Sequence, residues 1–262
     1  MLSYLPAHIV VYLAVVAGLL GLVMGSALNC LALRLASGQR WSGASRSACP
    51  HCGHTLQPVD LVPLFSWLLL KGKCRYCKAP VSPRYPITEA ALALIYVALV
   101  LKFGLSLQLL SALVFASCLF CLSLVDLDTQ IIPDRFILIP IVVRLIELVI
   151  TGGFRALLSP ILTGLVIAGA VLIISLIMDK LLKKDTMGGG DIKLLFVIGL
   201  FLSVPECLLM VMLACVIGIL MASLMMKVRP DTPFPFGPAL SIAALISMLV
   251  GSAITSWYIS LF

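Results

Sequence analysis

Long apolar stretches dominate this chain and restrict what it can fold into. Runs of about 20 predominantly apolar residues recur along the sequence, and each is long enough to cross the hydrocarbon core of a bilayer. Hydrophobic residues make up 62% of the chain and charged residues only 11%, whereas about 25% of the residues of a soluble domain are charged. The chain has too few charged residues to form the surface of a water-soluble protein. We therefore predict an all-α integral membrane protein.

The apolar runs predict about eight transmembrane helices. Their approximate ranges are 9–33, 88–103, 107–126, 134–151, 156–179, 191–203, 205–226 and 237–260. The second and sixth of these spans are short. We expect no removable signal peptide, because the first apolar run is long and no basic segment precedes it.

Basic residues set the expected orientation of the spans. The segment 34–86 contains eight Lys and Arg residues, Arg40 and Arg46 among them, but a single acid, Asp60. Lys and Arg gather in cytoplasmic loops, so we place this loop in the cytoplasm and both termini outside. The net charge of +7 then reflects topology and contact with anionic membrane lipid, and we expect no nucleic-acid partner.

Four cysteines in this loop form two CxxC pairs. The pairs are Cys49 with Cys52 and Cys74 with Cys77, separated by 21 residues. This spacing is close to that of zinc ribbons, and two such turns can complete a tetrahedral sulfur site for structural Zn²⁺. Metal binding would supply folding free energy that a loop of about fifty residues lacks. Disulfides are disfavoured in a reducing cytoplasm. Redox-active or unmetallated thiols are the alternatives, with His51 or His54 as a ligand only if a cysteine is unused.

Two acidic segments lie at the expected span ends. One is Asp126-Leu-Asp-Thr-Gln-Ile-Ile-Pro-Asp134, and the other is Gly188-Gly-Gly-Asp191. A carboxylate inside a membrane costs about 2.5–3.5 kcal/mol, so it suggests function by default. On the predicted topology Asp126 and Asp191 could meet at the cytoplasmic side, where two carboxylates sharing a proton could hydrolyse a peptide bond. Helix capping and pairing with lysines is the alternative role, and Asp128 competes with Asp126 on chemistry alone.

The glycines before Asp191 suggest support for a bound substrate. Gly188 and Gly190 permit unusual backbone conformations and the close approach of another chain. Lys193 follows Asp191 by two residues and belongs to the same candidate substrate-supporting segment.

The ordered motifs of the chain resemble those of the type IV prepilin peptidases. They are Gly25-Ser-Ala-Leu-Asn29 followed by Arg34, the two CxxC pairs, Asp60-Leu-Val-Pro63, Lys71-Gly-Lys-Cys74, Ser82-Pro-Arg-Tyr-Pro86 followed by Glu89, the two acidic segments and Pro235-Phe-Gly-Pro238. A lone GxGD segment would be weak, but this ordered set is specific and runs through most of the chain.

The resemblance implies a GxGD-type aspartic membrane peptidase. Such an enzyme cleaves the leader from prepilins and pseudopilins at the cytoplasmic face of the bacterial inner membrane. It also methylates the new N-terminal residue with S-adenosylmethionine. Carried over, the catalytic pair is Asp126 and Asp191 rather than Asp128, and Gly72 is associated with methyl transfer. We expect an N-terminal span with a zinc-ribbon-like, methyltransferase-associated loop in residues 1–87, and a polytopic peptidase domain in residues 88–262.

Two alternatives to the bifunctional enzyme remain. The first is a peptidase without methyltransferase activity, since no Gly-rich nucleotide fingerprint locates the methyl donor. The second, from another class, is a zinc-binding membrane transporter or scaffold that uses Arg144 and Glu147 as a transport pair. A buried ion pair between these two residues, three positions apart on one helix, is the simpler interpretation.

Overall fold

The protein folds into two compact helical units. The computed structural model describes residues 6–38, 47–184, 187–228 and 234–261; the loop cations Arg40 and Arg46 lie outside these ranges. The units are Met1–Leu105 and Ser106–Phe262. The described residues contain helices and two isolated β-bridges but no extended strand, so the predicted all-α membrane architecture is confirmed.

The first unit pairs two long helices and carries a compact loop between them. Its elements are α1 (Ala7–Ala36), the 3-10 helix η2 (Pro58–Leu61), α2 (Phe65–Leu69) and α3 (Arg84–Phe103). α1 packs along α3. Two glycines of α1 permit this close approach, because a Cβ at Gly21 would lie 2.5 Å from the Cα of Ala93 and one at Gly25 would lie 2.8 Å from the Cα of Glu89.

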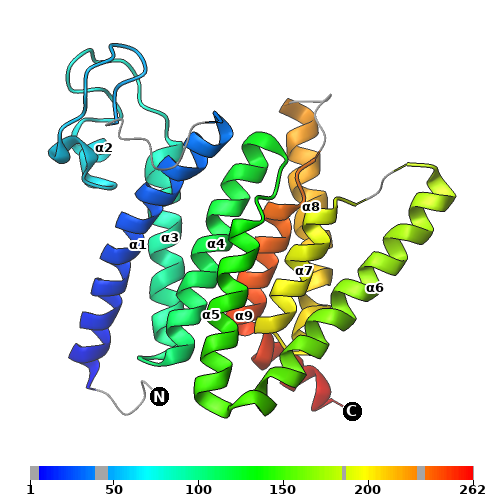
Figure 1. The fold of residues 1–262 in the computed structure, drawn as a ribbon. Coiled ribbons are helices and arrows are strands. Elements are labelled where there is room, and N and C mark those ends of the chain that lie inside the picture. The colour runs from blue at the N-terminus through cyan, green and yellow to red at the C-terminus, as the bar shows by residue number, and fades with distance from the viewer. Residues whose placement is uncertain (1–5, 39–46, 185–186, 229–233, 262) are drawn as a thin grey trace. The chain divides into compact units, whose positions relative to one another are not determined.

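The second unit is a bundle of six long or medium helices (Figure 1). They are α4 (Leu107–Thr129), α5 (Arg135–Gly152), α6 (Leu158–Leu182), α7 (Gly189–Phe201), α8 (Val204–Val228) and α9 (Gly237–Ile259), with the 3-10 helix η3 (Phe154–Leu157) joining α5 to α6. α4 packs against α5 and α9, and α7 packs against α5, α6 and α9. α4 and α9 are the most buried of the candidate spans, so they form the centre of the bundle.

Each of the eight predicted spans corresponds to one helix of the structure. Six of the described helical segments are long and apolar enough to cross a membrane: α1, α3, α4, η3 with α6, α8 and α9. α7 falls outside this set with only 13 residues, and α5 carries Arg135, Arg144 and Glu147 within its 18 residues. The predicted count of eight spans therefore stays a prediction.

Local sequence explains how α4 and α5 are delimited. The hydroxyl of Ser106 accepts the N–H of Leu109 and so caps the first turn of α4. Gln130 adopts the left-handed conformation (φ 57°) and ends α4 three residues after the expected end of the span. α5 then begins at Arg135, after Pro133, which lacks an N–H to donate and cannot continue a helix.

Candidate functional site

Asp126 lies in the last turn of α4 and is almost completely buried, with 4% of its surface exposed. Its Oδ2 accepts the backbone N–H of Gly237, the first residue of α9, at 3.0 Å. A helix N-terminus presents unpaired N–H groups and a partial positive charge, which suit a carboxylate. The beginning of α9 therefore fixes the side chain of Asp126.

Asp191 lies in the first turn of α7, immediately after three glycines. Its side chain is partly buried, and its Oδ1 has no hydrogen-bond partner among the described residues. α7 packs against α9, whose first residue binds Asp126, so the two carboxylates belong to neighbouring helices. Buried carboxylate oxygens are normally hydrogen-bonded. An oxygen of Asp191 that lacks such a partner is therefore available to a substrate or a water molecule.

The other predicted residues of this segment lie around Asp191 in different ways. A Cβ at Gly190 would lie 3.0 Å from the Cβ of Ile132, whereas a Cβ at Gly188 would approach Asp191 Oδ2 only to 3.5 Å. Gly190 therefore packs tightly against the α4–α5 connection. Lys193 forms an exposed ion pair with Asp134, with 2.7 Å between Nζ and Oδ1, which joins α7 to the start of α5.

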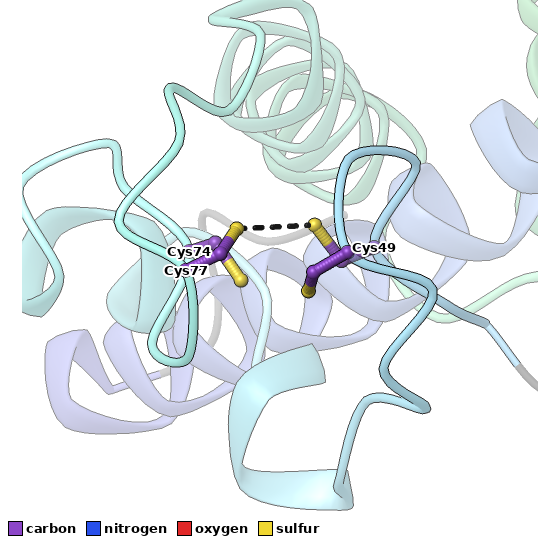
Figure 2. Close-up of side chains that lie close together, drawn as sticks. Cys49, Cys74 and Cys77 are labelled. Atoms are coloured by element: carbon purple, nitrogen blue, oxygen red, sulfur yellow. Dashed lines mark hydrogen bonds between the residues drawn. The ribbon is translucent and has the colours of Figure 1, made fainter.

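The two halves of the tetracysteine loop fold as matching turns (Figure 2). In each turn a β-bridge, Ala48 with Thr55 or Lys73 with Pro80, brackets one CxxC pair. The residue after the second cysteine has positive φ in both, 68° at Gly53 and 62° at Lys78, and donates its N–H to the carbonyl of the first cysteine. Left-handed residues close such turns, so both thiols of a pair face the same side.

The four sulfur atoms form a group that fits one metal ion. Those of Cys49, Cys52, Cys74 and Cys77 lie within 4.8 Å of one another. The Cys49 and Cys77 sulfurs are 3.8 Å apart, which matches the edge of about 3.8 Å expected for a tetrahedron with metal–sulfur bonds of about 2.3 Å. Backbone N–H groups of Cys52 and His51 lower the pKa of Cys49 to about 6, and thiolates are the form that binds metal.

Side chains of the first unit hold this loop in place. The indole N–H of Trp67 donates to the carbonyl of Val81 at 3.1 Å. Glu89 is buried in α3 and accepts the N–H of Leu64, which has a φ of 61°. Gly72 has a φ of 70°, and a Cβ there would lie 2.9 Å from the ring of Trp67. Gly72 therefore combines a left-handed backbone with contact to an aromatic ring, just before the second CxxC pair.

Comparison with known proteins assigns a family to this arrangement. Residues 19–103 match the model described as the bacterial peptidase A24 N-terminal domain, and residues 113–223 match the model of the type IV leader peptidase family. A prepilin leader peptidase/N-methyltransferase of Pseudomonas aeruginosa is 33% identical, over 99% of this chain and 97% of that protein. The chain belongs to the type IV leader peptidase family.

Other family members give the same result. A prepilin leader peptidase/N-methyltransferase of Aeromonas hydrophila is 36% identical, over 83% of this chain and 76% of that protein. Another, from Bacillus subtilis, is 33% identical over 83% of this chain and 87% of that protein. No solved structure matches the chain. The family resemblance stated from the motifs is thereby confirmed along most of the sequence.

The sequence did not identify the residue that holds Asp126. Gly237 was noted only as part of the Pro-Phe-Gly-Pro motif of the leader peptidase family. A Cβ at this position would lie 2.7 Å from Asp126 Oδ2, so only glycine brings its N–H this close to the carboxylate. The proline after Gly237, which is well suited to the first turn of a helix, was the available signal that a helix N-terminus begins there.

Proposed function

We propose that this protein is a membrane aspartic endopeptidase that removes the leader from type IV prepilins and pseudopilins and then methylates the new N-terminal amine. The observation that carries the peptidase assignment is geometric: Asp126 lies in the last turn of α4 against the first residue of α9, and Asp191 lies in the first turn of α7, which packs on α9. The names of the curated relatives support both activities.

The catalytic proposal assigns hydrolysis to the two aspartates acting together. Two neighbouring carboxylates share one proton, so that one is a base while the other is an acid. The ionised carboxylate removes a proton from water as its oxygen attacks the peptide carbonyl carbon. The protonated one donates its proton to the carbonyl oxygen, which gives a tetrahedral intermediate. As the C–N bond breaks, the first carboxyl group passes the proton it took from water to the leaving amine, and the second recovers a proton from a hydroxyl of the intermediate. The N–H of Gly237 holds Asp126 in place, and the unpartnered Oδ1 of Asp191 is free to bind the water.

We place both proposed sites on the cytoplasmic side of a bacterial inner membrane. The cation-rich loop 34–86 supports this orientation under the positive-inside rule. The basic loops would face anionic lipid headgroups, and the prepilin would insert its apolar helix beside the bundle with its leader in the cytoplasm. Gly188, Gly190 and Lys193 would support the substrate segment next to Asp191.

The tetracysteine group would hold Zn²⁺, and residues 1–87 would serve methyl transfer. Four thiolates in a tetrahedral arrangement favour zinc. The methyl donor S-adenosylmethionine would supply the methyl group to the new amine. Asn29 of α1 is completely buried; its Oδ1 accepts from Arg84, and its Nδ2 has no partner among the described residues. The N–H groups of Asn29 Nδ2 would suit the carboxylate of the methionine moiety, and Gly72 shapes the neighbouring loop.

Intact mass measurement on processed prepilin tests the proposal. The purified enzyme is incubated in detergent with a panel of prepilins, with and without S-adenosylmethionine. We expect loss of the leader in both cases and a further gain of one methylene mass only with the methyl donor. Asp126→Asn and Asp191→Asn should each abolish cleavage while Asp128→Asn should not. Cleavage by the Asp191→Asn enzyme at the wild-type rate would rule out the dyad.

A further inference from the structure

A polar network joins three helices of the bundle far from the two aspartates. Arg144 of α5 binds Glu147 Oε2 through Nη1 at 2.6 Å, so the ion pair expected from the sequence is confirmed. The Ser111 hydroxyl of α4 donates to the same carboxylate oxygen. The Nε of Arg144 donates to the carbonyl of Leu200, near the end of α7, at 3.0 Å. α4 and α7 are thus both tied to one ion pair of α5.

An aromatic contact joins α4 directly to α7 at the same level. The rings of Phe115 and Phe201 are stacked, with centroids 4.0 Å apart and an angle of 6° between the planes. The guanidinium of Arg144 lies 5.2 Å from the centroid of the Phe201 ring, within range of a cation–π interaction. We call this set of Ser111, Phe115, Arg144, Glu147, Leu200 and Phe201 the far-end clamp.

The far-end clamp lies at nearly equal distances from the two aspartates. Phe201 follows Asp191 by ten residues in α7, and Phe115 precedes Asp126 by eleven in α4. At a helical rise of about 1.5 Å per residue, these separations are about 15 Å and about 16.5 Å. The stacked rings set a common level for α4 and α7. Measured along the helix axes from that level, Asp126 and Asp191 differ by about one residue, or about 1.5 Å.

Near Asp191, α7 is held by the tight packing of Gly190 on Ile132 and by weak polar contacts. Three glycines, which lack side chains to pack, precede Asp191, and a Cβ at Gly189 would meet no atom within 4 Å. The ion pair of Lys193 with Asp134 is exposed on both sides, and exposed pairs contribute little. By contrast, Arg144 and Glu147 are 12% and 7% exposed. The far-end clamp therefore adds a buried polar restraint on how far α7 can slide, beside the apolar packing of Leu194 and Leu195 nearer Asp191.

We propose that Arg144 and Phe201 are positioning residues, which set the height of Asp191 relative to Asp126 from the far end of α7. This inference rests on the proposed function, in which these aspartates form the catalytic pair. A slip of α7 by one residue would displace Asp191 by about 1.5 Å. Since a misplacement of about 1 Å can cost about 100-fold in rate, the clamp acts on turnover without touching the substrate.

Two conservative substitutions test the far-end clamp while leaving the buried Glu147 a positively charged partner. Arg144→Lys keeps a cation for Glu147 but loses the Nε donor to Leu200 and the planar group over Phe201. Phe201→Leu removes the ring stack. The matched control is Phe196→Leu, the same change on the same helix, at a residue that packs on Gly164 of α6. Each variant is measured for kcat and KM on a prepilin and for its unfolding temperature in detergent.

We expect kcat to fall about 10- to 100-fold in Arg144→Lys and Phe201→Leu, with KM within twofold and the unfolding temperature unchanged. Phe196→Leu should keep its kcat within twofold. The inference is overturned if the two clamp variants turn over normally, if their kcat and unfolding temperature fall together, or if Phe196→Leu loses as much. Asp126→Asn and Asp191→Asn are assayed in parallel. If the two Asn variants are inactive while Arg144→Lys cleaves at the wild-type rate, the positioning role of the clamp is rejected but the proposed function stands. If the two Asn variants are active, both the proposed function and the clamp are rejected.

Discussion

Replacing Gly237 by alanine perturbs Asp126 through a single added atom. Gly237 is the first residue of α9 and has no positive φ, so alanine introduces no backbone strain there. Its Cβ would lie 2.7 Å from Asp126 Oδ2 and 3.4 Å from a methyl carbon of Leu122. The first distance is too short for a real contact. Because Asp126 is buried, either its carboxylate rotates away or the start of α9 moves, and the hydrogen bond from the Gly237 N–H is lost in both cases.

The size of the effect follows from that hydrogen bond. A hydrogen bond to a charged group contributes about 1.5–3 kcal/mol, and a change of about 1.4 kcal/mol in the activation free energy alters a rate tenfold. If Asp126 is held in its catalytic position by this bond, Gly237→Ala should lower kcat/KM for leader cleavage by about 10- to 150-fold.

The assay compares initial rates of leader removal with the unfolding temperature in detergent. Gly169→Ala in α6 is the matched control, because a Cβ at Gly169 meets no atom within 4 Å and alanine is the better helix former. We expect the control to cleave at the wild-type rate and to be equally stable or more stable. Wild-type cleavage by Gly237→Ala would refute the role given to the α9 N-terminus, and so would a loss of activity matched by general unfolding.

Three further predictions concern the first unit. Gly72→Ala should destabilise the loop by about 1–2 kcal/mol, because its left-handed backbone disfavours a Cβ that would also meet Trp67; intact mass should show cleaved but unmethylated prepilin. Cys74→Ser should lower the metal content measured by mass spectrometry from one ion per chain to near zero, since three thiolates cannot complete the tetrahedral site. Gly21→Ala should destabilise the unit by about 1–3 kcal/mol through overpacking, measured by thermal unfolding, because the added atom would lie 2.5 Å from Ala93.

Controls distinguish these effects from general damage. Cys118→Ser, in the middle of α4 and outside the tetracysteine group, should leave the metal content unchanged. Gly53 has a φ of 68° but no atom near its Cβ position, so Gly53→Ala should show the backbone effect without the clash. Full methylation by Gly72→Ala, or a full metal complement in Cys74→Ser, would contradict the roles given to these residues.

Hydropathy located the helices α1 and α3 to α9, but not the residues at which they begin and end. The third predicted span ends at Asp126, whereas α4 continues to Thr129. Asp128 is exposed, so this last turn is polar on its outer side, and hydropathy marks where apolar residues stop rather than where backbone hydrogen bonds stop. The predicted span for α7 began at residue 191, because a glycine run favours a loop. The helix already begins at Gly189, since its backbone hydrogen bonds start before its apolar side chains do.

Contacts between residues a few positions apart can be predicted from this sequence, whereas contacts between different helices cannot. The CxxC turns are local, and their spacing predicted the group of four sulfur atoms that the structure contains. The ion pair of Arg144 and Glu147 is local as well. Its further partners, Ser111 and the carbonyl of Leu200, come from other helices, as does the bond from Gly237 to Asp126 across 111 residues. Such contacts depend on how the helices pack, which no spacing in this chain encodes.

The shortness of α7 has a consequence for the surrounding lipid. Thirteen residues of helix measure about 20 Å, whereas the hydrocarbon core is about 30 Å thick. For α7 to be one of the eight predicted spans, the remaining 10 Å or so would have to be met by local thinning of the bilayer or by solvent that enters from one side, at a cost that grows with the mismatch. Turnover should therefore depend on acyl chain length, with thin bilayers favouring hydration of the end of α7 that carries Asp191.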